Sequence, residues 1–234
     1  MRTAILEKAK ADIPLYFNDF QAFWNESIAN INDDDLYEIY RATIIPKNYK
    51  IVFHSLNLKD FDLLINEIFE DINSSFFLSL IGLYRSAHMH LRSSIELTLQ
   101  LIYFIHHPIE FKQWKNGDFV LKHDKIMEYI NKHPNFDSDI SPLLTRITQN
   151  WKKFSKHIHG ESPIFFQCEL DSRRTNSFKV RDFGVWKSNY TKNIYSINKL
   201  LLLFFKEDLS RFPSKSFELL TELLTDNDKL LIES

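Results

Sequence analysis

The feature that most constrains the fold of this chain is a long stretch without proline. Between Ser74 and His106 there is no proline and only one glycine, Gly82. Nothing local prevents a helix of up to about 30 residues there, roughly 45 Å long at 1.5 Å per residue. Pro108 ends the stretch. We therefore predict a long helix in the middle of the chain.

Composition favours helices in the rest of the chain as well. The 234 residues include 21 Phe but only 4 Gly and 7 Pro, so turn formers are scarce and large packing units are common. A hydrophobic share of 44% is enough to build a core. The predicted fold class is all-α, a helical bundle around the long central helix.

Apolar residues at helical spacing predict further helices on both sides of this stretch. The clearest covers residues 139–159, where Ser141 is a suitable N-cap, Pro142 follows at the first helical position and Gly160 stands where a C-cap belongs. The others are expected at 14–30, 33–45, 58–72, 119–132, 186–212 and 217–224.

Two segments lack a helical pattern. Residues 49–53, just after Pro46, predict a short strand or a connector. Residues 161–185 contain two short apolar runs around a polar turn, which is typical of a β-hairpin near 164–183 or of an ordered surface loop.

The predicted elements divide the chain into three parts. We expect N-terminal helices in 1–57 to pack on a bundle formed by 58–212, followed by a C-terminal helix and tail in 213–234. The length suits a single globular unit.

Charge and cysteine content exclude little. The formal net charge is −2, which neither demands nor excludes nucleic acid as a partner. The single cysteine, Cys168, suits a reducing compartment. Residues 1–14 show no signal-peptide pattern, and the most apolar stretches, 76–83 and 200–205, are far shorter than the roughly 20 residues that a bilayer span needs. We expect a cytoplasmic protein without a membrane segment.

One face of the predicted central helix is ionisable. At about 100° per residue, Arg85, His88, Arg92 and Glu96 fall within a sector of roughly 80° on an otherwise apolar helix. Charged groups inside a bundle need partners. Arg92 and Glu96 can pair with each other at i, i+4, whereas Arg85 and His88 need a partner from another element.

The end of the 139–159 helix could supply that partner. There Lys156, His157 and His159 gather in the last turn, where the helix dipole favours an imidazolium. If this end meets the ionisable face, the pocket would contain arginines, histidines and a carboxylate. Such a pocket could hold a phosphodiester and offer a histidine for proton transfer.

Three short motifs in these two helices resemble a known family. Arg85-x4-His90, Arg92-Ser93-Ser94-Ile95-Glu96 and Ser155-Lys156-x-x-His159-Gly160 are similar to motifs of the HEPN superfamily of helical domains, in particular its uncharacterised and abortive-infection-like branches. The resemblance covers residues 60–212. It implies metal-independent RNA cleavage by a dimer, with a histidine and an arginine acting at the 2′-OH and the scissile phosphate.

Transferred to this chain, the resemblance makes Arg85 the phosphate binder and His90 the acid or base, and we expect His159 as a further catalytic residue. The substrate-binding residues would then be Arg92, Glu96, His88, Lys156 and His157. In a regular helix Arg85 and His90 point about 140° apart, so they share a pocket only if the helix starts or deforms nearby, for example at Gly82, or if a dimer supplies the second side. Arg85, Arg92, Glu96 and His159 form an equally good site by geometry.

Other chemistries find less support in the sequence. His157 and His159 diverge at i, i+2 on a helix, and no cysteine or carboxylate cluster completes a metal site, so we expect neither a metal nor a cofactor. Glycine-rich phosphate loops and a Gly-x-Ser-x-Gly elbow are absent.

Two hypotheses follow. In the first, a HEPN-like protein binds or cleaves RNA by metal-independent transesterification in a bacterial toxin or antiviral-defence setting, as a homodimer and with an antitoxin or another defence protein as a further partner. In the second, the chain is a non-catalytic helical interaction module whose polar row is a structural ion-pair network.

Overall fold

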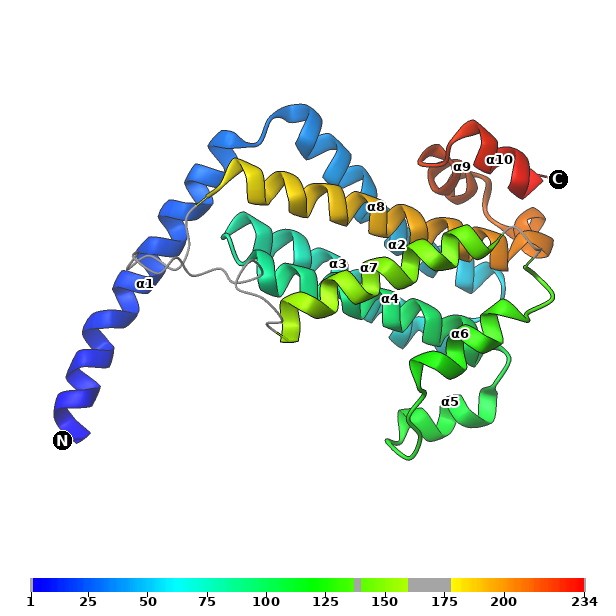
Figure 1. The fold of residues 1–234 in the computed structure, drawn as a ribbon, viewed down its shortest axis with the longest axis horizontal. Coiled ribbons are helices and arrows are strands. Elements are labelled where there is room, and N and C mark those ends of the chain that lie inside the picture. The colour runs from blue at the N-terminus through cyan, green and yellow to red at the C-terminus, as the bar shows by residue number, and fades with distance from the viewer. Residues whose placement is uncertain (1, 137–139, 160–177, 234) are drawn as a thin grey trace.

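Helices are the only regular elements in the part of the chain that the structure describes. The computed structural model describes residues 2–136, 140–159 and 178–233, and no strand occurs in these ranges (Figure 1). The predicted all-α class is confirmed. The hairpin expected near 164–183 lies outside the described residues except for its last positions, which lead directly into a helix at Val180.

Ten α-helices follow one another in the described ranges, and short 3-10 turns include those at Lys59–Phe61 and Lys206–Arg211. The α-helices are α1 Arg2–Asn30, α2 Asp33–Ser55, α3 Asp62–Leu80, α4 Tyr84–Ile105, α5 Pro108–Lys115, α6 His123–Asn131, α7 Ser141–His159, α8 Val180–Phe204, α9 Ser214–Glu222 and α10 Asp226–Glu233.

The single helix expected from Ser74 to His106 is wrong, because the chain reverses at Gly82. This glycine has φ +74°, a left-handed conformation that residues with a Cβ rarely adopt. A Cβ at position 82 would also collide with the ring of Phe23 from α1. As a result α3 ends at Leu80, α4 begins at Tyr84, and the two pack against each other as an antiparallel pair.

The expected helix end before Pro46 and the expected strand or connector at 49–53 are also wrong. Helix α2 continues through Pro46 to Ser55. A proline inside a helix costs about 3 kcal/mol. Here Tyr49, Val52 and Phe53 follow it and are almost completely buried, and the Tyr49 hydroxyl donates to Oδ1 of Asn198 at 2.8 Å. Burial of this second half of α2 outweighs the proline.

Helix α4 lies in the interior and positions the residues of interest. It packs against α3, α6, α7 and α8, and its side chains Leu91, Ile95, Leu99 and Ile102 are buried. Helix α7 runs antiparallel to α4, since residues late in α7 contact the first turn of α4. The start of α4 and the end of α7 therefore form one junction.

Helix α1 behaves differently from the rest. Figure 1 shows its first half extending away from the other helices. This half exposes several apolar side chains, among them Ile13 and Phe17. No helix in the described ranges is both long and apolar enough to cross a membrane.

Candidate functional site

Arg85, in the first turn of α4, is bound to the end of α7. Its Nε donates to the carbonyl oxygen of His157 at 2.6 Å, and its Nη2 donates to the carbonyl oxygen of Ile158 at 2.9 Å. The last carbonyls of a helix have no partner within the helix and carry partial negative charge, so a guanidinium is well matched to them. The two sequence patches thus meet within one chain.

His88, one turn further along α4, lies beneath this contact. Its ring stacks on the ring of His157 with a centroid distance of 4.3 Å and an interplanar angle of 1°. The side chain is buried, so a ligand at the junction would meet His157 and not His88. His88 therefore supports the site without forming its surface.

Hydrogen bonds fix the protonation state of His88. A carbonyl oxygen only accepts, so His88 Nδ1 donates to the carbonyl oxygen of Tyr84 at 2.7 Å. Lys153 Nζ donates to Asn189 Oδ1 at 2.8 Å, which turns the amide nitrogen of Asn189 toward His88 Nε2 at 2.9 Å. Since that nitrogen only donates, Nε2 must accept, and the ring is neutral.

Both stacked histidines are neutral at pH 7. Burial lowers the pKa of His88 to about 3, and the charges of His157 and Lys153 shift it in the same direction. Burial lowers the pKa of His157 to about 4, and the positive charges of Lys153 and Arg85 shift it in the same direction. The expectation that the helix dipole would favour an imidazolium at His157 is therefore wrong, because desolvation and the neighbouring cations outweigh the dipole.

Lys156 and His159, both in the last turn of α7, are exposed. They are the members of the predicted set that solvent reaches most easily. Gly160 and the following residues up to 177 are outside the described part of the chain, as are the predicted C-cap and Cys168. The exposed side of the last turn of α7 thus carries a cation and an imidazole.

Arg92 and Glu96 form a second cluster, about 10 Å further along α4 at 1.5 Å per residue. Arg92 Nη2 is 2.8 Å from Glu96 Oε1, which also accepts a hydrogen bond from Trp151 Nε1 at 2.8 Å. The guanidinium of Arg92 lies 5.0 Å from the ring centroid of Trp151. The structure places this pair with α7, but away from the end that binds Arg85.

His123, at the start of α6, is a member of this second cluster that sequence reasoning missed. Its ring stacks on Trp151 at 4.4 Å, and burial lowers its pKa. No local pattern in the sequence indicates this contact, because it depends on how α6 docks against α7.

His90 faces a different neighbour. Its Nδ1 lies 2.7 Å from Oδ1 of Asp71, a buried residue of α3. The chain reversal at Gly82 precedes Tyr84 and leaves the helix between Arg85 and His90 regular. The two residues therefore lie on different sides of α4, and the structure does not bring them together within one chain.

The described residues contain no group of three or more His, Cys, Asp or Glu side chains that could hold a metal ion. The arrangement at the junction is one of hydrogen-bond donors, a cation and imidazoles, which suits binding of an anion and transfer of a proton.

Comparison of the chain with models of protein families, with curated proteins and with solved structures found no match.

Proposed function

We propose that this chain binds RNA at the junction of α4 and α7 and cleaves it by metal-independent transesterification at a 2′-OH. The observation that supports the proposal is the bonding of Arg85 to the end of α7, which brings its guanidinium to the helix turn that carries His157, Lys156 and His159. This combination matches the needs of a reaction at a phosphodiester.

Each group has a role that follows from its surroundings. Arg85 and Lys156 bind the phosphate oxygens and stabilise the negative charge that builds up on them. Neutral His157 accepts the proton of the 2′-OH as the 2′-oxygen attacks phosphorus. The protonated His157 then returns this proton to the departing 5′-oxygen, so the products are a 2′,3′-cyclic phosphate and a 5′-hydroxyl. His88 holds the ring of His157 in place by stacking.

The choice of RNA over other phosphodiesters rests on the resemblance of the motifs to HEPN domains. The same resemblance supports a toxin or antiviral-defence role in the cytoplasm, with an antitoxin or another defence protein as a partner. The site differs from the motif in one respect, because Arg85 contacts His157 at the end of α7, whereas His90 contacts Asp71 of α3.

The test is cleavage of a labelled single-stranded RNA in EDTA. We expect products with 2′,3′-cyclic phosphate ends, and a rate at least about 100-fold lower for His157→Gln and for Arg85→Ala. His90→Gln is the matched control, because it removes a histidine of the same helix from the opposite side and should leave the rate unchanged. Melting temperatures of all variants separate loss of activity from loss of fold.

Two results would contradict the proposal. One is the absence of RNA cleavage by the folded wild-type chain. The other is a loss of cleavage in His90→Gln together with full activity in His157→Gln, which would return the chemistry to the other side of α4.

A second candidate function is that of a non-catalytic helical interaction module. The observation that favours it is the set of contacts that Arg92, Glu96 and Trp151 make with one another, as expected for a structural network. In that case Arg92→Ala and Glu96→Ala lower the melting temperature by similar amounts. RNA is then neither bound nor cleaved at the junction of α4 and α7.

A further inference from the structure

Helix α1 carries an apolar stripe that its own chain covers only in part. The stripe consists of Leu6, Ile13, Phe17, Phe20, Trp24 and Ile28, which at 100° per residue fall within a sector of roughly 80°. Phe17 is 68% exposed and Ile13 66%. Phe23, which anchors α1 under Gly82, is buried and lies on another face of the helix.

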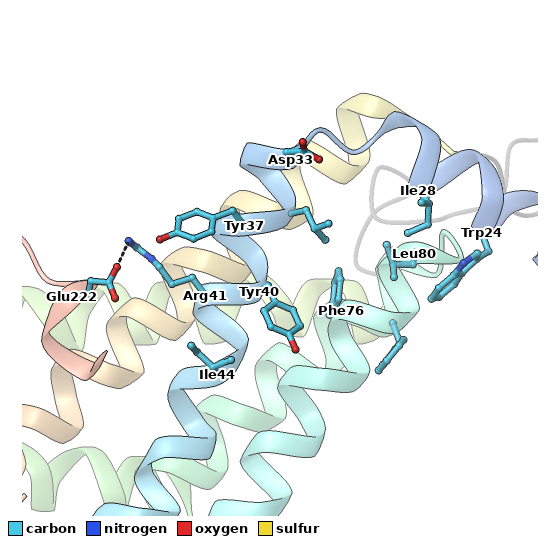
Figure 2. Close-up of a pocket in the computed structure, with 12 residues that line it drawn as sticks. Trp24, Ile28, Asp33, Tyr37, Tyr40, Arg41, Ile44, Phe76, Leu80 and Glu222 are labelled. Atoms are coloured by element: carbon cyan, nitrogen blue, oxygen red, sulfur yellow. Dashed lines mark hydrogen bonds and ion pairs between the residues drawn. The ribbon is translucent and has the colours of Figure 1, made fainter. Parts of the chain in front are cut away.

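The stripe ends in an apolar groove. Trp24 and Ile28 line a cavity of about 700 Å³ together with residues of α2 and α3, among them Tyr40 and Phe76 (Figure 2). Trp24 stacks on Phe77 of α3 with a centroid distance of 6.4 Å. One continuous apolar surface therefore runs from the projecting half of α1 into the body of the molecule.

We propose that a second copy of this chain covers this surface, with the two α1 helices antiparallel about a twofold axis near Phe17. In that register residue i faces residue 34 − i of the second copy. Leu6 of one copy then meets Ile28 of the other, Phe17 meets Phe17, and the projecting half of each α1 enters the other copy's groove. The stripe is thus complementary to itself, as a twofold interface requires.

The exposed area is large enough for a stable pair. The aromatic side chains of the surface, Phe17, Phe20, Tyr37, Tyr40 and Phe77, are between 36% and 68% exposed. At about 200 Å² for a whole aromatic side chain, they leave roughly 550 Å² per chain uncovered. Two copies would bury roughly 1,100 Å² from these residues alone, which exceeds the roughly 1,000 Å² expected of a specific interface.

Charge at the two ends of the surface supports the same register. Near the start of α1, Arg2 and Lys10 lie on the same side of the helix as the stripe, whereas the first turn of α2, at the rim of the groove, carries Asp33 and Asp34. In the antiparallel pair the basic start of one α1 lies beside the acidic turn of the other copy. A parallel pair would instead place the basic turns together.

The test compares two glutamate variants of the full chain by sedimentation equilibrium. Phe17→Glu should raise the dissociation constant of the dimer at least about 100-fold, because each dimer loses two central aromatic side chains. Leu15→Glu is the matched control. Leu15 is 61% exposed, similar to Phe17, but points to the opposite side of α1, so its variant should dimerise like the wild type.

Cross-linking tests the direction of the helices. On a Cys168→Ser background, the pair Leu6→Cys and Ile28→Cys should form a disulfide between copies on oxidation, whereas Leu15→Cys should not. A wild-type chain that is monomeric at high micromolar concentration overturns the proposal and leaves the groove to another kind of partner. Equal weakening by Leu15→Glu and Phe17→Glu, or cross-linking through Leu15→Cys, overturns it too. Neither experiment depends on RNA cleavage, so this proposal and the proposed function can fail separately.

Discussion

Acidification should weaken the fold through His88. A histidine in an unfolded chain has a pKa near 6.5, whereas burial lowers the pKa of folded His88 to about 3. The stabilising contribution of this difference is fully present above the unfolded pKa and is lost as the pH falls from about 6.5 toward about 3. The loss has a clear structural reason, because protonated Nε2 would point a hydrogen at the amide group of Asn189.

The magnitude follows from proton linkage. Between pH 7 and pH 5 an unfolded histidine takes up most of one proton, and folded His88 takes up almost none. The free energy of unfolding therefore falls by about 2 kcal/mol over this interval through His88 alone. Water barely screens this effect, since the His88 side chain is only 2% exposed.

The assay is urea unfolding followed by circular dichroism at pH 5 and pH 7. The decrease in the free energy of unfolding from pH 7 to pH 5 should be about 2 kcal/mol smaller in His88→Gln than in the wild type. His159→Gln, which removes an exposed histidine, should keep the wild-type decrease. Asn189→Asp offers a second variant, because a carboxylate beside Nε2 raises the pKa of His88 and should also reduce the decrease. A wild-type pH dependence in both His88→Gln and Asn189→Asp would refute the reasoning.

Two further changes test the fold and the second cluster. Gly82→Ala should lower the free energy of unfolding by more than about 1 kcal/mol, because of the positive φ at this position and the collision with α1. Gly184→Ala, inside α8, should raise the free energy of unfolding by up to about 1 kcal/mol. Chemical denaturation measures both changes, and equal effects of the two variants would contradict the role of the chain reversal. A double-mutant cycle of Arg92→Ala and Glu96→Ala should give a coupling energy of about 0.5–1 kcal/mol, and additive effects would show that the pair is not coupled.

The fold could be predicted from local patterns wherever the deciding forces were local. The stripe of α7 is an example, since periodicity acts within a few residues and Leu143, Ile147 and Phe154 are buried as it predicts. At Gly82 the sequence allowed both a continuous helix and a reversal, and contact with α1 decided for the reversal. At Pro46 burial of the following residues overrode a local helix breaker.

The site shows the same division. Helical periodicity alone placed Arg85 and His88 on one face of α4, and both contact residues near the end of α7. The neutral state of His157 could not be predicted, because the sequence reveals the helix end but not the degree of burial. The position of His123 was equally hidden, since it depends on the docking of α6.

The most direct test of the proposed site is a titration of the wild-type chain with a short single-stranded RNA, observed through the histidine ring signals in the NMR spectrum. The account predicts saturable shifts for His157 and His159 at the junction and unchanged signals for His90, on the other side of α4, and for His106, after its far end. Unchanged signals for His157 and His159, or a largest shift at His90, would contradict it.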